Sequence, residues 1–234
     1  MVLLAALALA QAPQTLALRM RVGDSWTTEF HEQLRNLGEE FDESDVWVEQ
    51  YRVIRVEAVG ATVSFTRTFQ YTQIGQDKIP PAKGTTPETG EMLLLPGGGF
   101  TRPKTEDASP QATRLRRLDS LGVRFPTGPV PIGQEWSYDL PRLGAVPDAR
   151  TTWRLDSLLD LAERKVAVVS FRVVENPTFD FPMESSGTRD VDLVSGVVLQ
   201  ESGTTRNYPV PGGDFRVDRI VTRKLLKVHM PRDG

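Results

Sequence analysis

Histidine, cysteine and carboxylate side chains are the usual carriers of catalysis and metal binding, and this sequence combines them sparsely. The 234 residues include no cysteine and two histidines, His31 and His229. Without cysteine there are no disulfides, thiol nucleophiles, thiolate zinc sites or lipidated N-terminal cysteines. His31-Glu32 lacks the second histidine of a zincin helix, and its strand-like surroundings predict an outward, polar His31. His229 is expected on a solvated or fraying end. No metal ion or cofactor is expected.

Carboxylate chemistry is the one catalytic class that composition leaves open, because Asp and Glu together number 31. The densest acidic cluster is Glu39, Glu40, Asp42, Glu43 and Asp45. It lacks the alternating Asp/Asn pattern and central glycine of an EF-hand loop, so a solvated hairpin tip is expected. Paired carboxylates could support hydrolysis, but no pair stands out. We therefore predict no catalytic residues, and the sequence leaves the ligand-binding residues unassigned.

The sequence also lacks the patterns typical of phosphate-binding loops and of nucleic-acid-binding surfaces. Gly97-Gly98-Gly99 is followed by no Lys-Ser/Thr pair, which predicts a plain turn. The net charge is −3, and the short basic groups 114–117 and 223–227 are balanced by acids elsewhere, so a nucleic-acid partner is not expected. The four tryptophans could line a ligand cavity, but Trp26 and Trp136 open predicted strands and are expected in the core.

The first residues resemble a signal peptide. Residues 2–10 form an apolar run, and Ala10-Gln11-Ala12 fits a cleavage site, which predicts a signal peptide over 1–12 and a mature chain beginning at Pro13. No Lys or Arg precedes the run, and a first strand or a short buried helix is the alternative. The run is too short to span a bilayer, and the mean hydropathy is −0.31, so we expect a periplasmic or secreted protein and not an integral membrane protein.

Beyond residue 20, alternation of apolar and polar residues rich in β-branched and aromatic types dominates, which predicts half-buried antiparallel strands. The expected fold is mainly β: a curved antiparallel sheet, a partial barrel or a sandwich. The predicted strands cover residues 25–35, 46–56, 62–72, 165–174 and 215–228, a short buried strand over 92–95, and two short strands around a Ser195-Gly196 turn within 189–200.

One short helix is predicted over 110–121, with Ser109 as cap and Gly122 as stop. Residues 156–164 fit either a second short helix or a strand and turn. The stretches 78–89 and 97–103 are rich in Pro, Gly and Thr and predict loops. Because a curved sheet needs cover on one face, the helix and the 78–103 segment are the candidate covers.

The two halves of the chain contain short matching segments that indicate an internal repeat. Residues 22–26 (VGDSW) match 132–136 (IGQEW), each an aliphatic residue, Gly, two polar residues and Trp. Tyr51-Arg52-Val53 matches Trp153-Arg154-Leu155, and Val63-Ser64-Phe65 matches Val169-Ser170-Phe171. Duplicated halves over 13–125 and 126–234 are expected, with a seam near 125–131. One continuous domain is the alternative.

The strand opening and the Gly-x-x-x-x-Asp-x-x-x-Gly hairpin of residues 187–196 resemble uncharacterised exported bacterial β-rich domains, which are loosely similar to the curved sheets of periplasmic lipoprotein carriers. The resemblance implies an envelope-facing β protein and transfers no catalytic residue. The expected function is non-catalytic binding of an apolar ligand or an envelope protein partner. A carboxylate-based hydrolase and a purely structural scaffold are the alternatives.

Overall fold

The computed structural model describes residues 12–35, 43–101, 122–142, 147–161, 164–178, 180–209 and 216–230. Alternating side chains in these ranges build one antiparallel sheet with the strand order β6-β5-β3-β2-β1-β12-β11-β10-β9-β8-β7, and β4 pairs with β3 beside this path. The strands are β1 (Ser25–Arg35), β2 (Glu43–Glu57), β3 (Gly60–Ile74), β4 (Asp77–Ile79), β5 (Glu88–Leu94), β6 (Phe100–Thr101), β7 (Glu135–Leu140), β8 (Ala149–Leu161), β9 (Arg164–Glu175), β10 (Glu184–Asp192), β11 (Val198–Pro209) and β12 (Arg216–His229).

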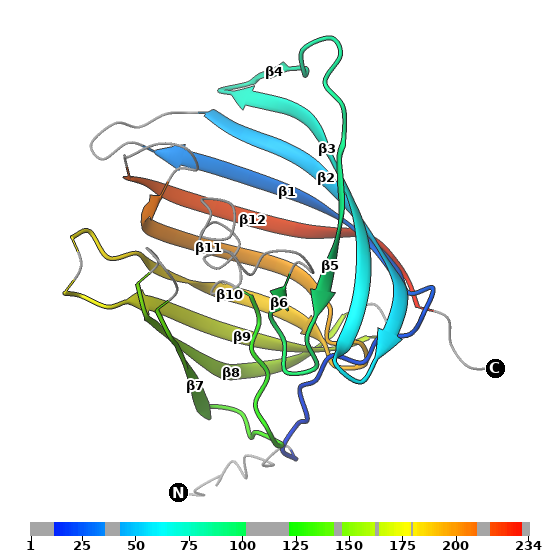
Figure 1. The fold of residues 1–234 in the computed structure, drawn as a ribbon, viewed down its shortest axis with the longest axis vertical. Coiled ribbons are helices and arrows are strands. Elements are labelled where there is room, and N and C mark those ends of the chain that lie inside the picture. The colour runs from blue at the N-terminus through cyan, green and yellow to red at the C-terminus, as the bar shows by residue number, and fades with distance from the viewer. Residues whose placement is uncertain are drawn as a thin grey trace, which may run out of the picture.

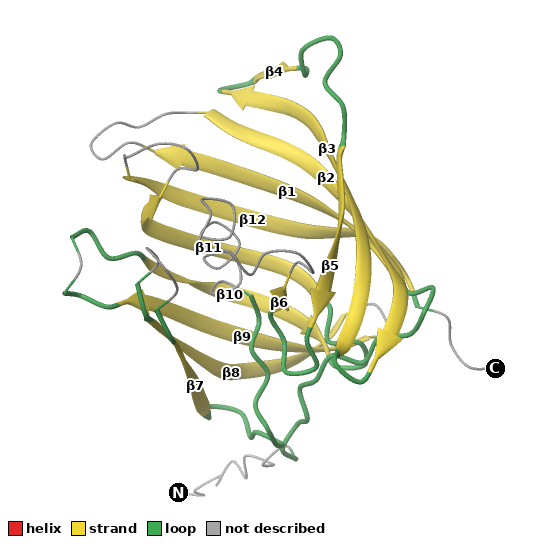
Figure 2. Ribbon diagram, in the orientation of Figure 1, coloured by secondary structure: helices red, strands yellow, loops and turns green. Residues whose placement is uncertain are grey.

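The sheet is bent into an open trough (Figure 1). Its long strands converge at one end of the view and spread apart at the other. The end strands β6 and β7 are not paired with each other, so the described sheet is not closed. The prediction of a mainly β, curved antiparallel sheet is therefore confirmed, in a single layer and not in the two layers of a sandwich. No helix occurs among the described residues (Figure 2), and none of these segments could span a membrane as a helix.

Most strand predictions agree with the structure within a few residues. The Ser195-Gly196 turn joins β10 to β11, and both strands are longer than expected. Residues 156–161, for which the sequence fitted either a helix or a strand and turn, continue β8. The strand has a bulge at Leu155/Ser157, and beyond it the pairing with β9 continues through Leu161. The predicted helix over 110–121 and the signal peptide residues 1–11 lie outside the described residues.

The 78–103 segment differs from the expectation of a covering loop. It contains part of β4, all of β5 and all of β6, and β5 pairs with β3 over seven residues, from Ala61 opposite Leu94 to Arg67 opposite Glu88. Its backbone groups are satisfied by extending the sheet sideways. The segment therefore forms one edge of the sheet and does not cover a face.

Two hydrophobic clusters stabilise the trough. The first centres on Trp153, Leu155 and Phe171 of the second half and includes Leu16 and Phe125 from connecting segments. The second gathers apolar residues of β1, β2, β3 and β11 together with Met20 and Val166. Backbone bonds from Gln14 to Val130 and from Arg19 to Ser195 fix the 12–20 segment in place. The N-terminal segment therefore contacts both halves of the sheet.

The matching segments 22–26 and 132–136, which lead into β1 and β7, make equivalent backbone hydrogen bonds. Gly23 (φ 95°) donates to Val53 O at 2.9 Å, and Gly133 (φ 87°) donates to Leu155 O at 2.6 Å. Trp26 lies opposite Tyr51, and Trp136 lies opposite Trp153. Trp26 is buried as expected, whereas Trp136 is half-buried on the edge strand β7. Duplication of the whole halves stays a prediction.

Candidate functional site

The concave face of the trough carries charged side chains at positions where strand alternation would place apolar ones. Glu49 shares its face of β2 with Trp47 and Tyr51, because residues two apart in a strand point the same way. The same holds for Arg67 between Phe65 and Phe69 on β3. Register places Glu88, Arg67 and Glu49 side by side on β5, β3 and β2, and it places Arg223, Glu201 and Arg189 side by side on β12, β11 and β10. The two sets meet diagonally across β1, because Glu49 lies opposite Thr28 and Arg223 lies opposite Phe30. We call these six residues, in which acid and base alternate, the charged row.

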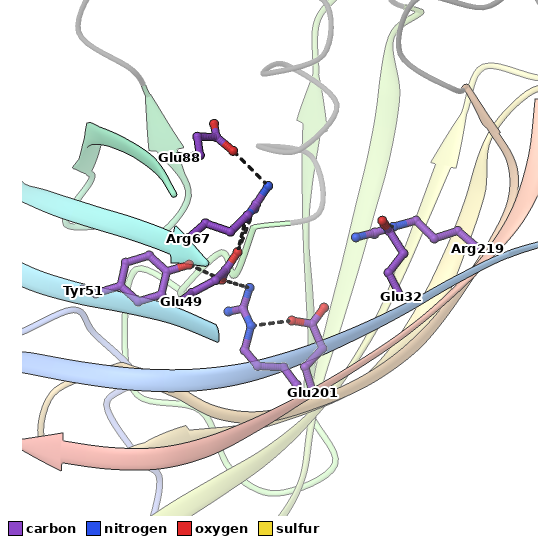
Figure 3. Close-up of polar contacts among 8 residues, drawn as sticks. Glu32, Glu49, Tyr51, Arg67, Glu88, Glu201 and Arg219 are labelled. Atoms are coloured by element: carbon purple, nitrogen blue, oxygen red, sulfur yellow. Dashed lines mark hydrogen bonds and ion pairs between the residues drawn. The ribbon is translucent and has the colours of Figure 1, made fainter. Parts of the chain in front are cut away.

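Ion pairs link each member of the charged row to the next, and Figure 3 shows those from Glu88 to Glu201. Arg67 Nη2 lies 2.7 Å from Glu49 Oε1, and its Nη1 lies 3.5 Å from Glu88. Arg223 lies between the two buried acids, 4.0 Å from Glu49 and 3.9 Å from Glu201. The row is closed by Arg189, whose Nη2 donates to Glu201 at 2.8 Å. Three acids and three bases make it charge-balanced.

A second pair, Glu32 and Arg219, lies beside the charged row on the same face. Arg219 Nε donates to Glu32 Oε1, joining β12 to β1. Two members of the charged row are deeply buried: the side chains of Glu49 and Arg189 are 3% and 4% exposed. Charges this buried are tolerated only when they are paired and hydrogen-bonded, which the row provides.

The electrostatics keep the two central acids ionised. Burial alone would raise the pKa of Glu49, but Arg223, Arg67 and the hydroxyl of Tyr51, which donates to Glu49 Oε2, leave that pKa below its ordinary value. Burial would also raise the pKa of Glu201, but Arg189 and Arg223 outweigh this effect and leave that pKa below its ordinary value. Burial and the adjacent Glu49 carboxylate raise the pKa of Tyr51. The acids therefore serve as fixed anions and the tyrosine as a neutral donor.

Aromatic rings flank the guanidinium groups of this face. Arg189 lies 4.4 Å from the Phe171 ring centroid and 5.3 Å from that of Trp153. Arg67 lies 5.5 Å from the ring of Trp47, which stacks on Phe30 at 5.3 Å. These contacts combine cation–π attraction with apolar burial. The concave face thus offers charged and aromatic surface side by side.

Several buried polar atoms of the concave face have no hydrogen-bond partner among the described residues. They come from four strands: Thr28 Oγ1, Trp47 Nε1, Trp153 Nε1 and Arg223 Nε. Buried polar atoms are nearly always satisfied, so each such atom calls for an explanation. All four can donate a hydrogen bond, so they match the acceptor oxygens of a bound molecule.

The 187–196 motif has a structural explanation. Asp192 is fully buried and accepts hydrogen bonds from Arg164, the amide of Val194 and the hydroxyl of Ser195. A Cβ on Gly196 would lie 2.5 Å from Ala17 O, and φ is 77° there. A Cβ on Gly187 would lie 2.2 Å from Ser202 O and 2.9 Å from the Phe171 ring. The motif therefore shapes the turn, and the missing side chain at Gly187 leaves room for the Phe171 ring on the neighbouring strand.

The residues weighed for chemistry in the sequence do not assemble into a site. His31 lies 3.0 Å from Glu29 Oε1 and is partly exposed, as expected. His229 is exposed, as expected for a solvated end, but it is not frayed, because it is the last residue of β12 and pairs with Ser25. In the acidic cluster, residues 39–42 lie outside the described ranges, and Asp45 accepts a hydrogen bond from Thr72 at 2.8 Å. Gly98 pairs with Arg124 beyond a turn. No group of metal-ligating side chains occurs among the described residues.

The charged row was missed from the sequence, although a signal for it exists. Each central member stands at the apolar parity of an alternating strand: Glu49 between Trp47 and Tyr51, Arg223 between Val221 and Leu225. A charge at such a position is costly unless a neighbouring strand supplies its partner. The sequence does not show that β1 and β12 are neighbours, so the partners could not be found from it.

No protein-family model and no curated protein matches the sequence. Among solved structures, the chain is similar to lipovitellin, in a structure described by its lipid–protein interactions, with a TM-score of 0.51 and 8% identity over 92% of this chain. That match covers 26% of the lipovitellin chain, so this chain spans about a quarter of its length.

Two bacterial structures are similar at lower scores. A candidate lipoprotein from Parabacteroides distasonis has a TM-score of 0.37 and 9% identity, over 94% of this chain and 100% of that chain. A candidate exported protein from Bacteroides fragilis with a YmcC-like fold has a TM-score of 0.33 and 10% identity, over 92% and 99%. The match to lipovitellin agrees, at the level of the fold, with the resemblance of the sequence to β-rich domains that are loosely similar to lipid-carrier sheets.

Proposed function

We propose that this protein is a non-catalytic binding module that holds an amphipathic molecule against the concave face of its sheet. The observation that carries the proposal is a set of buried donor atoms on that face that make no hydrogen bond to the described residues: Thr28 Oγ1, Trp47 Nε1, Trp153 Nε1 and Arg223 Nε. An acceptor-bearing headgroup would satisfy them, and the neighbouring aromatic rings would contact an apolar chain. The likeness to lipovitellin, which is described by its lipid–protein interactions, supports a ligand of this class.

The electrostatics favour binding over the hydrolase alternative. A carboxylate pair that cleaves a glycosidic bond needs one acid with a raised pKa to act as a proton donor. Glu49 and Glu201 are both clamped by arginines, and both have a lowered pKa. Asp190 does have a pKa raised by burial, but it lies on the opposite face of β10 from Arg189. The charged row is suited to fixing a headgroup and not to proton transfer.

The proposal is tested by replacing one unsatisfied hydroxyl with a methyl group of the same shape. Thr28→Val removes a buried hydroxyl that has no partner among the described residues, so the free energy of unfolding of ligand-free protein should stay the same or rise. Affinity for a fluorescent lysophospholipid should fall. The matched control is Thr205→Val on the same face, because Thr205 Oγ1 already has a partner, Ser185 Oγ at 2.9 Å. Its loss should cost stability and should weaken probe binding less than Thr28→Val does.

The outcomes separate the alternatives. Retained lipid in native mass spectra of the purified protein, together with weaker probe binding by Thr28→Val than by Thr205→Val, supports carriage. Absence of any bound probe at micromolar concentration would contradict the proposal and favour the scaffold. Equal probe affinity in wild type and Thr28→Val would place the ligand away from this face.

We also infer that the chain is exported and that its mature form begins at Pro13. The apolar run and Ala10-Gln11-Ala12 support this inference. Cleavage after Ala12 would leave the backbone pairing of Gln14 with Val130 intact. Expression with the native start in a bacterial host, followed by N-terminal sequencing of the periplasmic fraction, should return Pro13. An intact Met1 found in cytoplasmic protein alone would contradict it.

A further inference from the structure

A groove of about 430 Å³ lies on the outer face of the sheet, opposite the charged row. On β12, its lining includes Lys227 and His229 but not Val228 between them. Val228 packs against the second hydrophobic cluster, so alternation turns its two neighbours to the outer face. We call this the outer groove, and its lining residues are Ser25, Trp26, Thr27, Gln50, Tyr51, Arg52, Ser64, Phe65, Thr66, Lys227 and His229.

Strand register arranges the outward side chains of the groove in two parallel rows. One row holds His229, Ser25, Arg52 and Ser64, and the other holds Lys227, Thr27, Gln50 and Thr66. Short hydroxyl side chains on β1 therefore lie between longer side chains on β12 and β2. This alternation of short and long residues makes the hollow, with β1 as its floor.

The charges of the outer groove are one-sided. Arg52, Lys227 and His229 are the titratable side chains on its outer rim, and no carboxylate occurs among the described residues that line it. The next outward residue of β1 is Glu29, whose carboxylate lies 3.0 Å from His31 Nε2. Arg52 and Lys227 thus give the groove lining a positive charge, although the net charge of the chain is −3.

We propose that the outer groove binds a phosphate-class oxyanion carried on a small organic group. Arg52 and Lys227 supply charge-assisted donors, and the hydroxyls of Ser25, Thr27 and Thr66 supply neutral ones, which together suit a tetrahedral anion. The volume falls in the range of about 300–1,000 Å³ usual for small-molecule sites, so it accommodates an ester and not only an ion. The site is on the opposite face from the lipid proposed above and is independent of it.

Such an ester has two possible sources, a soluble phosphate ester or the headgroup of an anionic membrane. Glycerol 3-phosphate, measured by isothermal titration calorimetry, is the probe for the first. Vesicles containing phosphatidylglycerol, compared with pure phosphatidylcholine vesicles in a sedimentation assay, are the probe for the second. Binding of glycerol 3-phosphate assigns a soluble ester, and binding to the anionic vesicles alone assigns a headgroup held at a surface.

The test variant is Arg52→Gln with Lys227→Gln, and the matched control is Lys224→Gln with Arg172→Gln. The control removes the same charge from the same face of the sheet, at side chains that do not line the groove. We expect the groove variant to lose about tenfold or more in affinity, since each lost contact is a hydrogen bond to a charged group. The control should stay within about twofold, because neither side chain lines the groove and the interactions of exposed charges are screened by salt.

Two results would overturn the proposal. One is wild-type protein that binds neither glycerol 3-phosphate nor anionic vesicles. The other is an equal loss in the groove variant and the control, which would indicate a general charge effect. Should the double variant not fold, the exposed His229→Gln serves in its place with the same expected direction. Lysophospholipid binding is measured in parallel and should be unchanged, so failure here is distinguishable from failure of the proposed function.

Discussion

Glu49 is the residue on which the charged row depends most. Its side chain is 3% exposed and meets Arg67, Arg223 and the hydroxyl of Tyr51. A carboxylate in this position forms ion pairs with two guanidinium groups at once. Removing it would leave both cations beside each other on the concave face.

We therefore predict that Glu49→Gln lowers the free energy of unfolding by about 3–5 kcal/mol, the cost of leaving a buried charge without its partner. Glu57→Gln is the control, because Glu57 is about half exposed and pairs at the surface with Arg55, where such a pair contributes about 1 kcal/mol or less. Urea unfolding followed by circular dichroism measures both. Equal midpoints for the two variants would contradict a structural role for the row.

The lowered pKa values of Glu49 and Glu201 predict an acid limb of stability. A carboxyl whose pKa is lower in the folded than in the unfolded state stabilises the fold above its unfolded value of about 4.3. That stabilisation is lost as the pH falls through the folded value. Urea midpoints should thus decline below about pH 4, and the decline should be shallower in Glu49→Gln than in Glu57→Gln. Parallel declines in the two variants would contradict the assignment.

At the scale of elements, the strands were predictable and their neighbours were not. Alternation in 46–56 and 62–72 is local, so it identified β2 and β3 and their hairpin. The short strands β4 and β6 and the first part of β5 were obscured by Pro, Gly and Thr, whereas the apolar residues 92–95 identified the end of β5. The pairing of β1 with β12 joins residues about 190 positions apart, and no local pattern records it.

The turn between β10 and β11 is predicted to be intolerant of any side chain at Gly196. Left-handed backbone at a non-glycine residue costs about 1–2 kcal/mol. Gly133→Ala, with φ 87° and no atom within 4 Å of the added Cβ, should show that cost alone. Gly196→Ala should cost more, since its Cβ would meet Ala17 O and displace the N-terminal segment. Thermal unfolding of both variants gives the comparison, and equal losses would show that the segment moves freely.

Trp26 and Trp136, which begin the matching strands, should contribute differently to the free energy of unfolding. Trp26 is 7% exposed and stacks on Tyr51 at 5.0 Å. Trp26→Ala should cost about 3–5 kcal/mol, as for other emptied aromatic sites in a core. Trp136 is half-buried and donates to Arg124 O at 2.8 Å, so Trp136→Ala should cost less. Urea midpoints near the wild-type value for both would remove the support for equivalent strand entries.

At the scale of the whole molecule, the first and last parts of the chain are joined at the middle of the sheet. β1 pairs with β12 along eleven residues, from Ser25 opposite His229 to Arg35 opposite Asp218. The charged row crosses the same seam, with Arg223 between Glu49 and Glu201. Residues 12–20 form backbone hydrogen bonds with Val130 and Ser195. A domain boundary near residue 125 would place β1 and β12 in different domains, although these contacts join them.

We therefore predict that residues 13–234 unfold as one cooperative unit, and that fragments 13–125 and 126–234 do not fold alone. Separation would expose β1 and β12 as long unpaired edges and strip the buried acids of Arg223, and both changes favour aggregation or unfolding. Tryptophan fluorescence distinguishes the halves when all indoles except Trp26, or all except Trp153, are replaced by Phe. Both single-tryptophan proteins should give the same urea midpoint as circular dichroism does. Two separated midpoints, or a fragment that gives dispersed amide resonances by itself, would instead establish two domains and leave the β1–β12 seam as an interface between them.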